Sequence, residues 1–127
     1  MQAQARDLSD GHVRDRAAEG DTSEAYPWDT VARLTDAGFM CMTIPKEFGG
    51  RGLSYVEAVL VIEQLARNCG ATARIVVEAN MGGVGAVMAY GSDAQKEKIA
   101  KLVLAGDKPA ICITEPDAGS AATEMRS

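Results

Sequence analysis

The residues with the clearest chemical potential lie near the C-terminus, in the run Thr114-Glu-Pro-Asp-Ala-Gly-Ser120. Its Pro, Asp and Gly residues are typical of a turn. A Gly-Ser pair is small, exposes backbone N–H donors and adds a hydroxyl, a combination that suits an anionic group. The alternative is an ordinary turn that ends a strand and binds nothing.

Other candidate residues carry weaker signals. Gly82-Gly-Val-Gly85 lacks the third glycine of a GxGxxG nucleotide loop and follows no strand, so we expect close helix packing there. Glu63 and Glu78 lie among apolar neighbours on expected helices, where exposure or an ion pair is favoured over catalysis. The partner in such a pair would be an arginine such as Arg67 or Arg74.

The cysteines and the histidine predict no metal site. Cys41, Cys69 and Cys112 are widely spaced, which gives neither a disulfide framework nor a CxxC pattern for zinc. The single histidine, His12, lies in a polar segment, where a solvated side chain is the default.

The composition is that of an ordinary globular protein. The 127 residues suffice for one domain with a buried core, and 46% hydrophobic with 24% charged residues argues against a disordered tail. A net charge of −5 and 5% aromatic residues argue against a nucleic-acid partner. The longest apolar-rich stretch, Arg74–Tyr90, is too short and too polar to span a bilayer, and the N-terminus has no apolar signal core. We therefore expect no membrane partner and a cytoplasmic location.

The first third of the chain predicts one surface helix and one buried helix. Residues 1–23 are polar, which indicates a frayed or surface helix followed by a loop through Glu19-Gly20-Asp21. Residues 26–38 predict a helix of about three turns. Pro27 suits its first position and Gly38 the left-handed position after its last turn.

Glycines and capping patterns divide the middle of the chain. After an apolar connector, Lys46–Gly52 predicts a tight loop whose backbone visits positive φ. Ser54-Tyr-Val-Glu57 is a capping-box pattern, and the helix behind it should end near Cys69-Gly70. Its apolar residues cover a wide face, so it should pack on more than one neighbour.

A long central helix is expected next. Ala71–Tyr90 predicts a single helix, although three glycines inside it each weaken it by roughly 1 kcal/mol relative to alanine. A break near Asn80 is the alternative. Ser92-Asp-Ala-Gln95 is a second capping-box pattern, and Gly106-Asp107 should end the helix that it opens.

The pattern changes after residue 107. Pro109–Thr114 is short, apolar and β-branched, and predicts a strand. Because a lone strand cannot satisfy its own backbone, we expect the chain to be cut across a domain. The predicted fold class is mainly α, with an all-α domain over residues 1–107 and the truncated start of a β domain over residues 108–127.

Four segments in a fixed order carry a family resemblance. They are Ile44-Pro-Lys-Glu-Phe-Gly-Gly-Arg-Gly-Leu-Ser54, Val61-Ile-Glu-Gln-Leu-Ala-Arg67, Tyr90-Gly-Ser-Asp-Ala-Gln-Lys-Glu-Lys98 and Ile113-Thr-Glu-Pro-Asp-Ala-Gly-Ser120. In this order and spacing, the chain from about Pro27 to Ser120 resembles the acyl-CoA dehydrogenase family. The resemblance implies an N-terminal helical-bundle domain, a middle β domain and a C-terminal four-helix bundle. This chain would supply the first domain and the opening strand of the second.

The resemblance also implies cofactor-binding residues. The backbone of Ile111 and Ile113 would lie beside the isoalloxazine ring, and Thr114 would hydrogen-bond the polar edge of the flavin. Gly119 and Ser120 would present N–H groups and a hydroxyl to the pyrophosphate, with Ser120 also near the substrate thioester.

One position departs from the family pattern, and one expected residue has no counterpart in this chain. The family often has Asp after the serine of this motif, whereas Ala121 follows here. The catalytic base of the family is a Glu in or near the C-terminal bundle. No position of this chain corresponds to it, so no catalytic residue is assigned.

The implied intact protein is an FAD-dependent acyl-CoA dehydrogenase that oxidises the α and β carbons of an acyl-CoA thioester. Its implied partners are the acyl-CoA substrate, an electron-transferring flavoprotein and further copies of itself in a homo-oligomer. The isolated chain is expected to be inactive and to lack FAD. The alternatives are a non-enzymatic helical interaction module, or a flavin oxidase or monooxygenase on the same scaffold.

Overall fold

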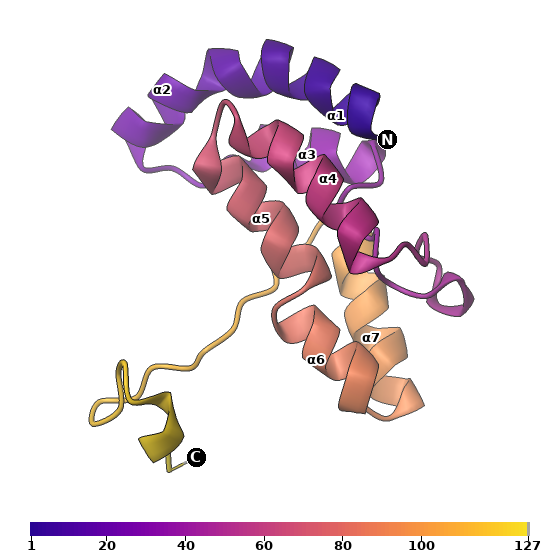
Figure 1. Ribbon diagram of the computed structural model, residues 1–127, viewed down its shortest axis with the longest axis vertical. Helices are drawn as coiled ribbons and strands as arrows, with labels where there is room; N and C mark the ends of the chain where they lie inside the picture. Colours follow the sequence, from indigo (N-terminus) through magenta and orange to yellow (C-terminus); the bar gives the residue numbers. More distant parts are fainter. Residues whose placement is uncertain (127) are drawn as a thin grey trace.

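The chain folds into a succession of helices joined by short loops, followed by an extended C-terminal segment (Figure 1). The computed structural model describes residues 1–126. The predicted, mainly helical fold is confirmed. The elements are α1 (Gln2–Leu8), the π-helical η1 (Ser9–Val13), α2 (Arg14–Ser23), α3 (Trp28–Asp36), the 3₁₀ turn η2 (Lys46–Phe48), α4 (Tyr55–Ala66), α5 (Gly70–Asn80), α6 (Gly83–Tyr90), α7 (Asp93–Leu104) and the 3₁₀ turn η3 (Ala122–Glu124).

The N-terminal rod, formed by α1, η1 and α2, runs along one edge of the molecule (Figure 1). The loop expected at residues 19–21 is wrong, because the helix continues to Ser23 and ends where Glu24 adopts a left-handed φ of 54°. The last turns are supported by a hydrogen bond from the Thr22 hydroxyl to the Ala18 carbonyl, at 2.9 Å.

The non-helical connector after α3 lies at the centre of the core. Its buried residues are Phe39, Met40, Cys41, Met42 and Ile44. Backbone N–H groups of the glycine loop satisfy its carbonyls: Leu53 donates to Met42 at 2.8 Å and Gly52 donates to Ile44 at 2.8 Å. Because its polar groups are paired in this way, an irregular apolar segment is able to occupy the interior.

The predicted glycine loop is confirmed. Gly49 and Gly52 have φ values of 85° and 64°. A Cβ at Gly50 would lie 2.1 Å from the Ile44 carbonyl oxygen, so only glycine allows the loop to approach the connector this closely.

Gly38 ends α3 as expected, with a φ of 73°. The Gly38 N–H donates to Thr35 at 2.8 Å and the Phe39 N–H donates to Leu34 at 2.9 Å, which is the Schellman pattern. Arg51 completes the helix end, since its Nε donates to the Gly38 carbonyl at 3.1 Å. The guanidinium thereby fastens the glycine loop to the C-terminus of α3.

Both predicted capping boxes are confirmed. The Ser54 hydroxyl accepts the Glu57 N–H at 3.3 Å while the Glu57 carboxylate accepts the Ser54 N–H at 2.8 Å. Ser92 and Gln95 repeat the arrangement at 3.4 and 2.8 Å. The start of α3 differs by one residue from the expectation, because Pro27 lies just outside the helix.

The single central helix expected over residues 71–90 is wrong, and the alternative break near Asn80 is correct. Asn80 is fully buried, and its side chain accepts the Thr43 N–H at 3.1 Å and donates to the Phe39 carbonyl at 2.8 Å. The Thr43 hydroxyl donates to the Asn80 carbonyl at 2.5 Å. This carbonyl, at the end of α5, is therefore satisfied by the connector. The glycines at positions 82 and 83 then allow the chain to change direction into α6.

Helix α4 packs on two neighbours, as its wide apolar face predicts: α1 on one side and α5 on the other. Ala58, Val61 and Leu65 face inward, whereas Val56 and Val59 remain 71% and 50% exposed. None of the helices in residues 1–126 is long and apolar enough to cross a membrane.

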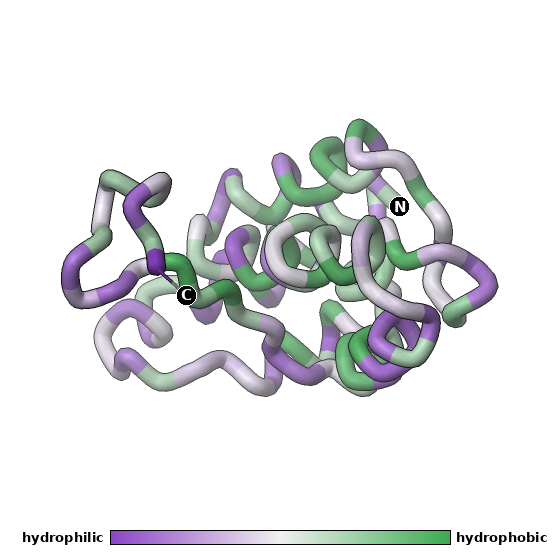
Figure 2. Tube along the Cα trace, turned by 90° about the horizontal axis from the view of Figure 1, so that it is seen from below, coloured by the Kyte–Doolittle hydropathy of each residue, from purple (hydrophilic) through white to green (hydrophobic). Residues whose placement is uncertain are grey.

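The strand predicted for residues 109–114 does not form within residues 1–126. This segment leaves the helices as a single stretch of chain, set to one side of them (Figures 1 and 2). Only an isolated bridge between Glu115 and Ala118 is present. A strand needs a neighbouring backbone to pair with, and no described segment pairs with this one.

Replacing Asn80 with alanine should lower the free energy of unfolding by about 2–4 kcal/mol, because buried connector groups lose their partners. Urea titration followed by circular dichroism measures the loss. Asn68→Ala is the matched control, since that half-buried amide bridges Ser9 and Asp10 nearer the surface. Equal losses in the two variants would show that Asn80 has no special role.

The fall in stability at acidic pH should depend on the protonation of Glu57. Hydrogen bonds from the backbone and hydroxyl of Ser54 lower the pKa of Glu57 below its ordinary value near 4.5. Its contribution should therefore be complete above that value and disappear as the pH falls through the lowered folded pKa. Glu57→Gln should reduce the fall of the melting temperature at acidic pH. Glu63→Gln, on the exposed side of the same helix, should leave that fall unchanged. The same dependence of melting temperature on pH in wild type and Glu57→Gln would contradict this assignment.

Candidate functional site

All five residues expected to contact a cofactor lie on the C-terminal segment, residues 111–126, outside the helical core. Ile111 and Ile113 are 45% and 43% exposed, and Thr114, Gly119 and Ser120 are exposed as well. The structure therefore places them on one accessible segment.

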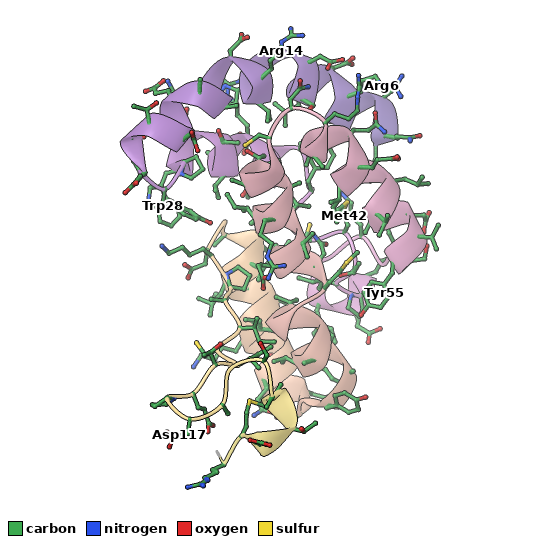
Figure 3. All side chains as sticks on the ribbon, turned by 60° about the vertical axis from the view of Figure 1, so that its left-hand side comes forward. Arg6, Arg14, Trp28, Met42, Tyr55 and Asp117 are labelled. Atoms are coloured by element: carbon green, nitrogen blue, oxygen red, sulfur yellow. The ribbon has the colours of Figure 1, made fainter. Side chains whose placement is uncertain are left out.

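A tight turn fixes the middle of this segment. The Glu115 N–H donates to the Ala118 carbonyl at 3.0 Å, and the Ala118 N–H donates back to Glu115 at 3.2 Å. The Arg126 N–H donates to the Glu115 carboxylate at 3.0 Å. Asp117 lies on the loop, well away from Met42 in the core (Figure 3).

The segment offers donors that the rest of residues 1–126 leaves unused. No backbone hydrogen bond within the described chain involves the N–H groups of Ile111, Ile113, Thr114 or Gly119. The Ser120 hydroxyl forms no hydrogen bond with another described residue, and a Cβ at Gly119 would meet no atom within 4 Å. An open row of N–H groups and hydroxyls is able to bind a ligand with several acceptor atoms.

A pocket of about 320 Å³ opens at the root of this segment, where residues 108–110 leave the helices. One wall is α5 and another is the linker that follows α7. It is lined by Tyr26, Arg74, Ile75, Glu78, Lys108, Pro109 and Ala110.

An ion pair dominates the α5 wall of this pocket, which we call the root pocket. Arg74 pairs with the Glu78 carboxylate one turn further along the helix, which confirms the expected arginine partner. The Glu78 side chain is only 14% exposed, and its Oε2 has no hydrogen-bond partner within the described residues. Arg74 is 67% exposed and retains N–H donors that Glu78 does not use.

The linker wall carries a second cation. The Lys108 ammonium lies 4.4 Å from the centre of the Tyr26 ring and 5.6 Å from that of Trp28. The two rings meet edge to face with centroids 4.6 Å apart. Burial raises the pKa of Tyr26, so its phenol is neutral at physiological pH.

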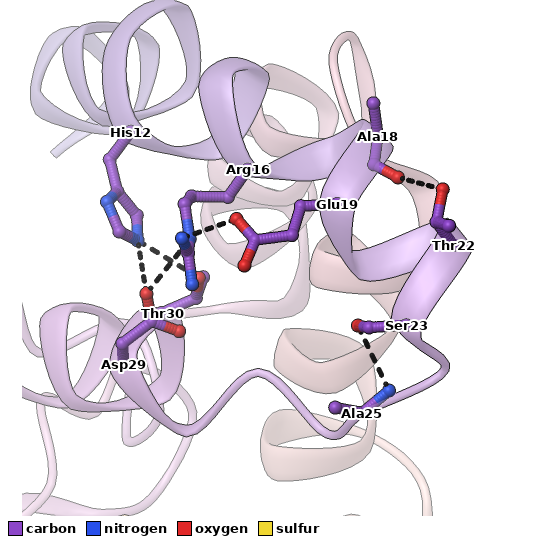
Figure 4. Close-up of polar contacts among 9 residues, drawn as sticks. All are labelled: His12, Arg16, Ala18, Glu19, Thr22, Ser23, Ala25, Asp29 and Thr30. Carbon is purple, nitrogen blue, oxygen red and sulfur yellow. Dashed lines mark hydrogen bonds and ion pairs between the residues drawn. The ribbon is translucent and has the colours of Figure 1, made fainter.

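His12 has a structural position. The solvated side chain expected for it is wrong, because the imidazole is half-buried between η1 and α3. Its Nε2 lies 3.0 Å from the Thr30 hydroxyl and 3.8 Å from the Asp29 carboxylate, which Arg16 also contacts at 3.2 Å (Figure 4). These contacts tie the N-terminal rod to α3. Among the described residues no group of three or more potential ligands could hold a metal ion.

A second, larger groove of about 490 Å³ lies between α6 and α7. Its lining is mostly apolar and includes Val87, Ile99 and the exposed Tyr90. Lys98 is its only charged residue, so it offers less for chemistry than the root pocket does.

Sequence reasoning singled out the C-terminal segment, whose role stays a prediction, and missed the root pocket. The spacing of Arg74 and Glu78 on one helix signalled their ion pair and not their place on a pocket wall. Nothing in the sequence brings Lys108 to Tyr26 and Trp28, because the contact depends on how α3 and α7 pack.

A comparison with family models matches residues 1–107 to "Acyl-CoA dehydrogenase, N-terminal domain". Among curated relatives, the 3-sulfinopropanoyl-CoA desulfinase of Paraburkholderia xenovorans (strain LB400) is 57% identical over 127 residues, covering 100% of this chain and 33% of that protein. The desulfinase of the same name from Variovorax paradoxus is 56% identical over 125 residues, 98% of this chain and 31% of that protein.

A more distant relative carries a different activity in its name. The probable acyl-CoA dehydrogenase fadE25 of Mycobacterium leprae (strain TN) is 28% identical over 127 residues, 100% of this chain and 33% of that protein. The chain thus spans about a third of the length of the curated relatives that it matches.

Proposed function

Since this chain belongs to the acyl-CoA dehydrogenase family, we propose that the protein carrying it binds FAD and acts on an acyl-CoA thioester. The family match ends at Asp107, which supports a helical domain over residues 1–107 and the start of a β domain from residue 108. In this arrangement the helical domain forms one wall of the pocket for the acyl chain.

The C-terminal segment is the proposed cofactor contact. Ile111 and Ile113 present backbone N–H groups to the flavin ring, and Thr114 hydrogen-bonds its polar edge. Gly119 and Ser120 donate to the pyrophosphate, with the Ser120 hydroxyl near the substrate thioester. The unused donors of this segment support the assignment. Bound FAD supplies the redox-active ring, and the protein supplies position and charge.

The proposed reaction is removal of a sulfinate group from 3-sulfinopropanoyl-CoA or a close analogue. The relatives that carry this activity in their names are 54–57% identical to this chain, against 28% for the relative named as a dehydrogenase. In the overall reaction the bond between carbon 3 and sulfur breaks, carbon 3 gains a proton and the released sulfur group gains hydroxide. One water molecule supplies both, sulfite leaves, and no external oxidant is consumed.

Arg74 in the root pocket is the observation that carries this proposal. A sulfinate is an anion, and a guanidinium offers it paired N–H donors with a fixed geometry. The root pocket holds Arg74 and Lys108 against the single carboxylate of Glu78, so its walls are net positive. It also adjoins the residues that lead into the proposed flavin contact, which suits it to the far end of a short acyl chain.

Dehydrogenation of the α and β carbons is the second candidate. The relative named as a probable acyl-CoA dehydrogenase supports it. This reaction needs an electron acceptor, for which an electron-transferring flavoprotein is the proposed partner, in a homo-oligomeric enzyme of the cytoplasm. The two candidates therefore differ in whether an acceptor is consumed.

The purified natural gene product should show the visible absorbance of flavin and release sulfite from 3-sulfinopropanoyl-CoA without any electron acceptor. A sulfite-reactive dye and mass spectrometry of the CoA product measure the turnover. Reduction of an artificial acceptor by a saturated acyl-CoA, with no sulfite release, would establish the dehydrogenase instead. A gene product without bound flavin or turnover of either substrate would favour a helical interaction module.

Arg74→Met should reduce kcat/KM for the sulfinate substrate roughly tenfold to hundredfold, the usual loss for a hydrogen bond to a charged group. Arg74→Lys should recover only part, because lysine keeps the charge and loses the paired donors. Arg14→Met, on the exposed face of α2, is the control (Figure 3). Unchanged kinetics in Arg74→Met would remove this residue from the substrate site.

A further inference from the structure

The linker between α7 and the C-terminal segment is held against the helices at successive points. Gly106 turns with a φ of 84°, and a Cβ there would lie 2.9 Å from the Thr35 hydroxyl oxygen on α3. Lys108 then reaches Tyr26 and Trp28. Ala110 passes α6 closely enough that a Cβ at Gly83 would lie 3.6 Å from its carbonyl oxygen.

The last of these contacts is at Ala110. Ile111 and the residues up to Thr114 are exposed and form no backbone hydrogen bond within the described chain. Among the described residues, the linker contacts are therefore the ones nearest to this segment that can orient it. Lys108 is the charged residue among these contact points. Its contacts with the two rings lie two residues before Ala110, the last contact point.

We propose that Tyr26, Trp28 and Lys108 form a cation–π clamp, and that Lys108 is a positioning residue for the segment over residues 111–120. This inference rests on the proposed function, in which that segment contacts the flavin. The clamp itself is a property of the apoprotein and is testable without cofactor.

The geometry favours a clamp over a free ligand-binding lysine. A cation within about 6 Å of an aromatic centroid is attracted to the ring face, and Lys108 meets that condition for both rings. No ion pair within residues 1–126 involves its ammonium, so the rings are its described partners. The Lys108 N–H is also fixed, since it bonds the Asp107 carboxylate at 3.2 Å.

The chain contains its own probes for this contact. Trp28 is the only tryptophan, so all tryptophan emission comes from one ring of the clamp. Cys112 is exposed on the segment, whereas Cys41 is buried and Cys69 half-buried. In a Cys69→Ser background, a thiol-reactive acceptor on Cys112 makes energy transfer from Trp28 a direct measure of the position of the segment.

Time-resolved energy transfer should give a narrow Trp28–Cys112 distance distribution for the parent chain. Lys108→Met should broaden it, with the displaced population increased roughly two- to tenfold by the loss of the exposed cation–π contacts with Tyr26 and Trp28. Lys108→Arg should restore the narrow distribution, because a guanidinium also stacks on aromatic rings. Lys101→Met, on the exposed side of α7, should match the parent.

An unchanged distribution in Lys108→Met, or no rescue by Lys108→Arg, would overturn the clamp. Melting temperatures should agree among the variants, which separates positioning from general stability. In the flavin-bound gene product, Lys108→Met should weaken FAD retention several-fold, and Lys108→Arg should recover it. If the gene product binds no FAD at all, the proposed function fails while the apoprotein result on the clamp still stands.

Discussion

The buried amide of Asn80 is the interaction on which the architecture depends. It bonds the connector at Thr43 and Phe39 and so fixes an irregular apolar segment inside a helical domain. The same contact ends α5, which lets α6 and α7 fold beneath it (Figure 1). Because α7 delivers the linker to α3, the geometry at Asn80 determines where the C-terminal segment leaves the domain. A leucine of similar size would fill the volume but leave the connector's polar groups unpaired.

Local rules predicted the parts of this fold that depend on neighbouring residues. The capping boxes at Ser54 and Ser92 and the left-handed Gly38 were correctly predicted, because each is decided within a few positions of sequence. The single helix over residues 71–90 was wrong for the opposite reason. Its break depends on an amide that binds residues about forty positions earlier, and helical periodicity carries no sign of such a partner.

The same division holds for the candidate site. The donor-rich C-terminal segment was visible as a motif, and its role in binding stays a prediction. The root pocket was not visible, because Arg74 comes from α5, Tyr26 from the approach to α3 and Lys108 from the linker. Only packing brings these residues together. In the proposed function, this pocket is where a preference for a charged acyl group would reside.

The π-helical stretch at Ser9–Val13 sets the rotational phase of the N-terminal rod. The wider turns of η1 accommodate one extra residue, so deleting one residue there would let the rod relax to a regular α-helix with its faces in place. Each residue of an α-helix advances about 100° around its axis, so the same deletion within α2 would swing α1 by that angle relative to the rest of the chain. Ala5 would leave its buried place, and Arg6 would lose its 3.0 Å contact with Gln64 on α4. Homologous proteins should therefore accept a one-residue gap within η1 more readily than within α1 or α2, where a change of length would misalign one half of the rod with the helices beneath it.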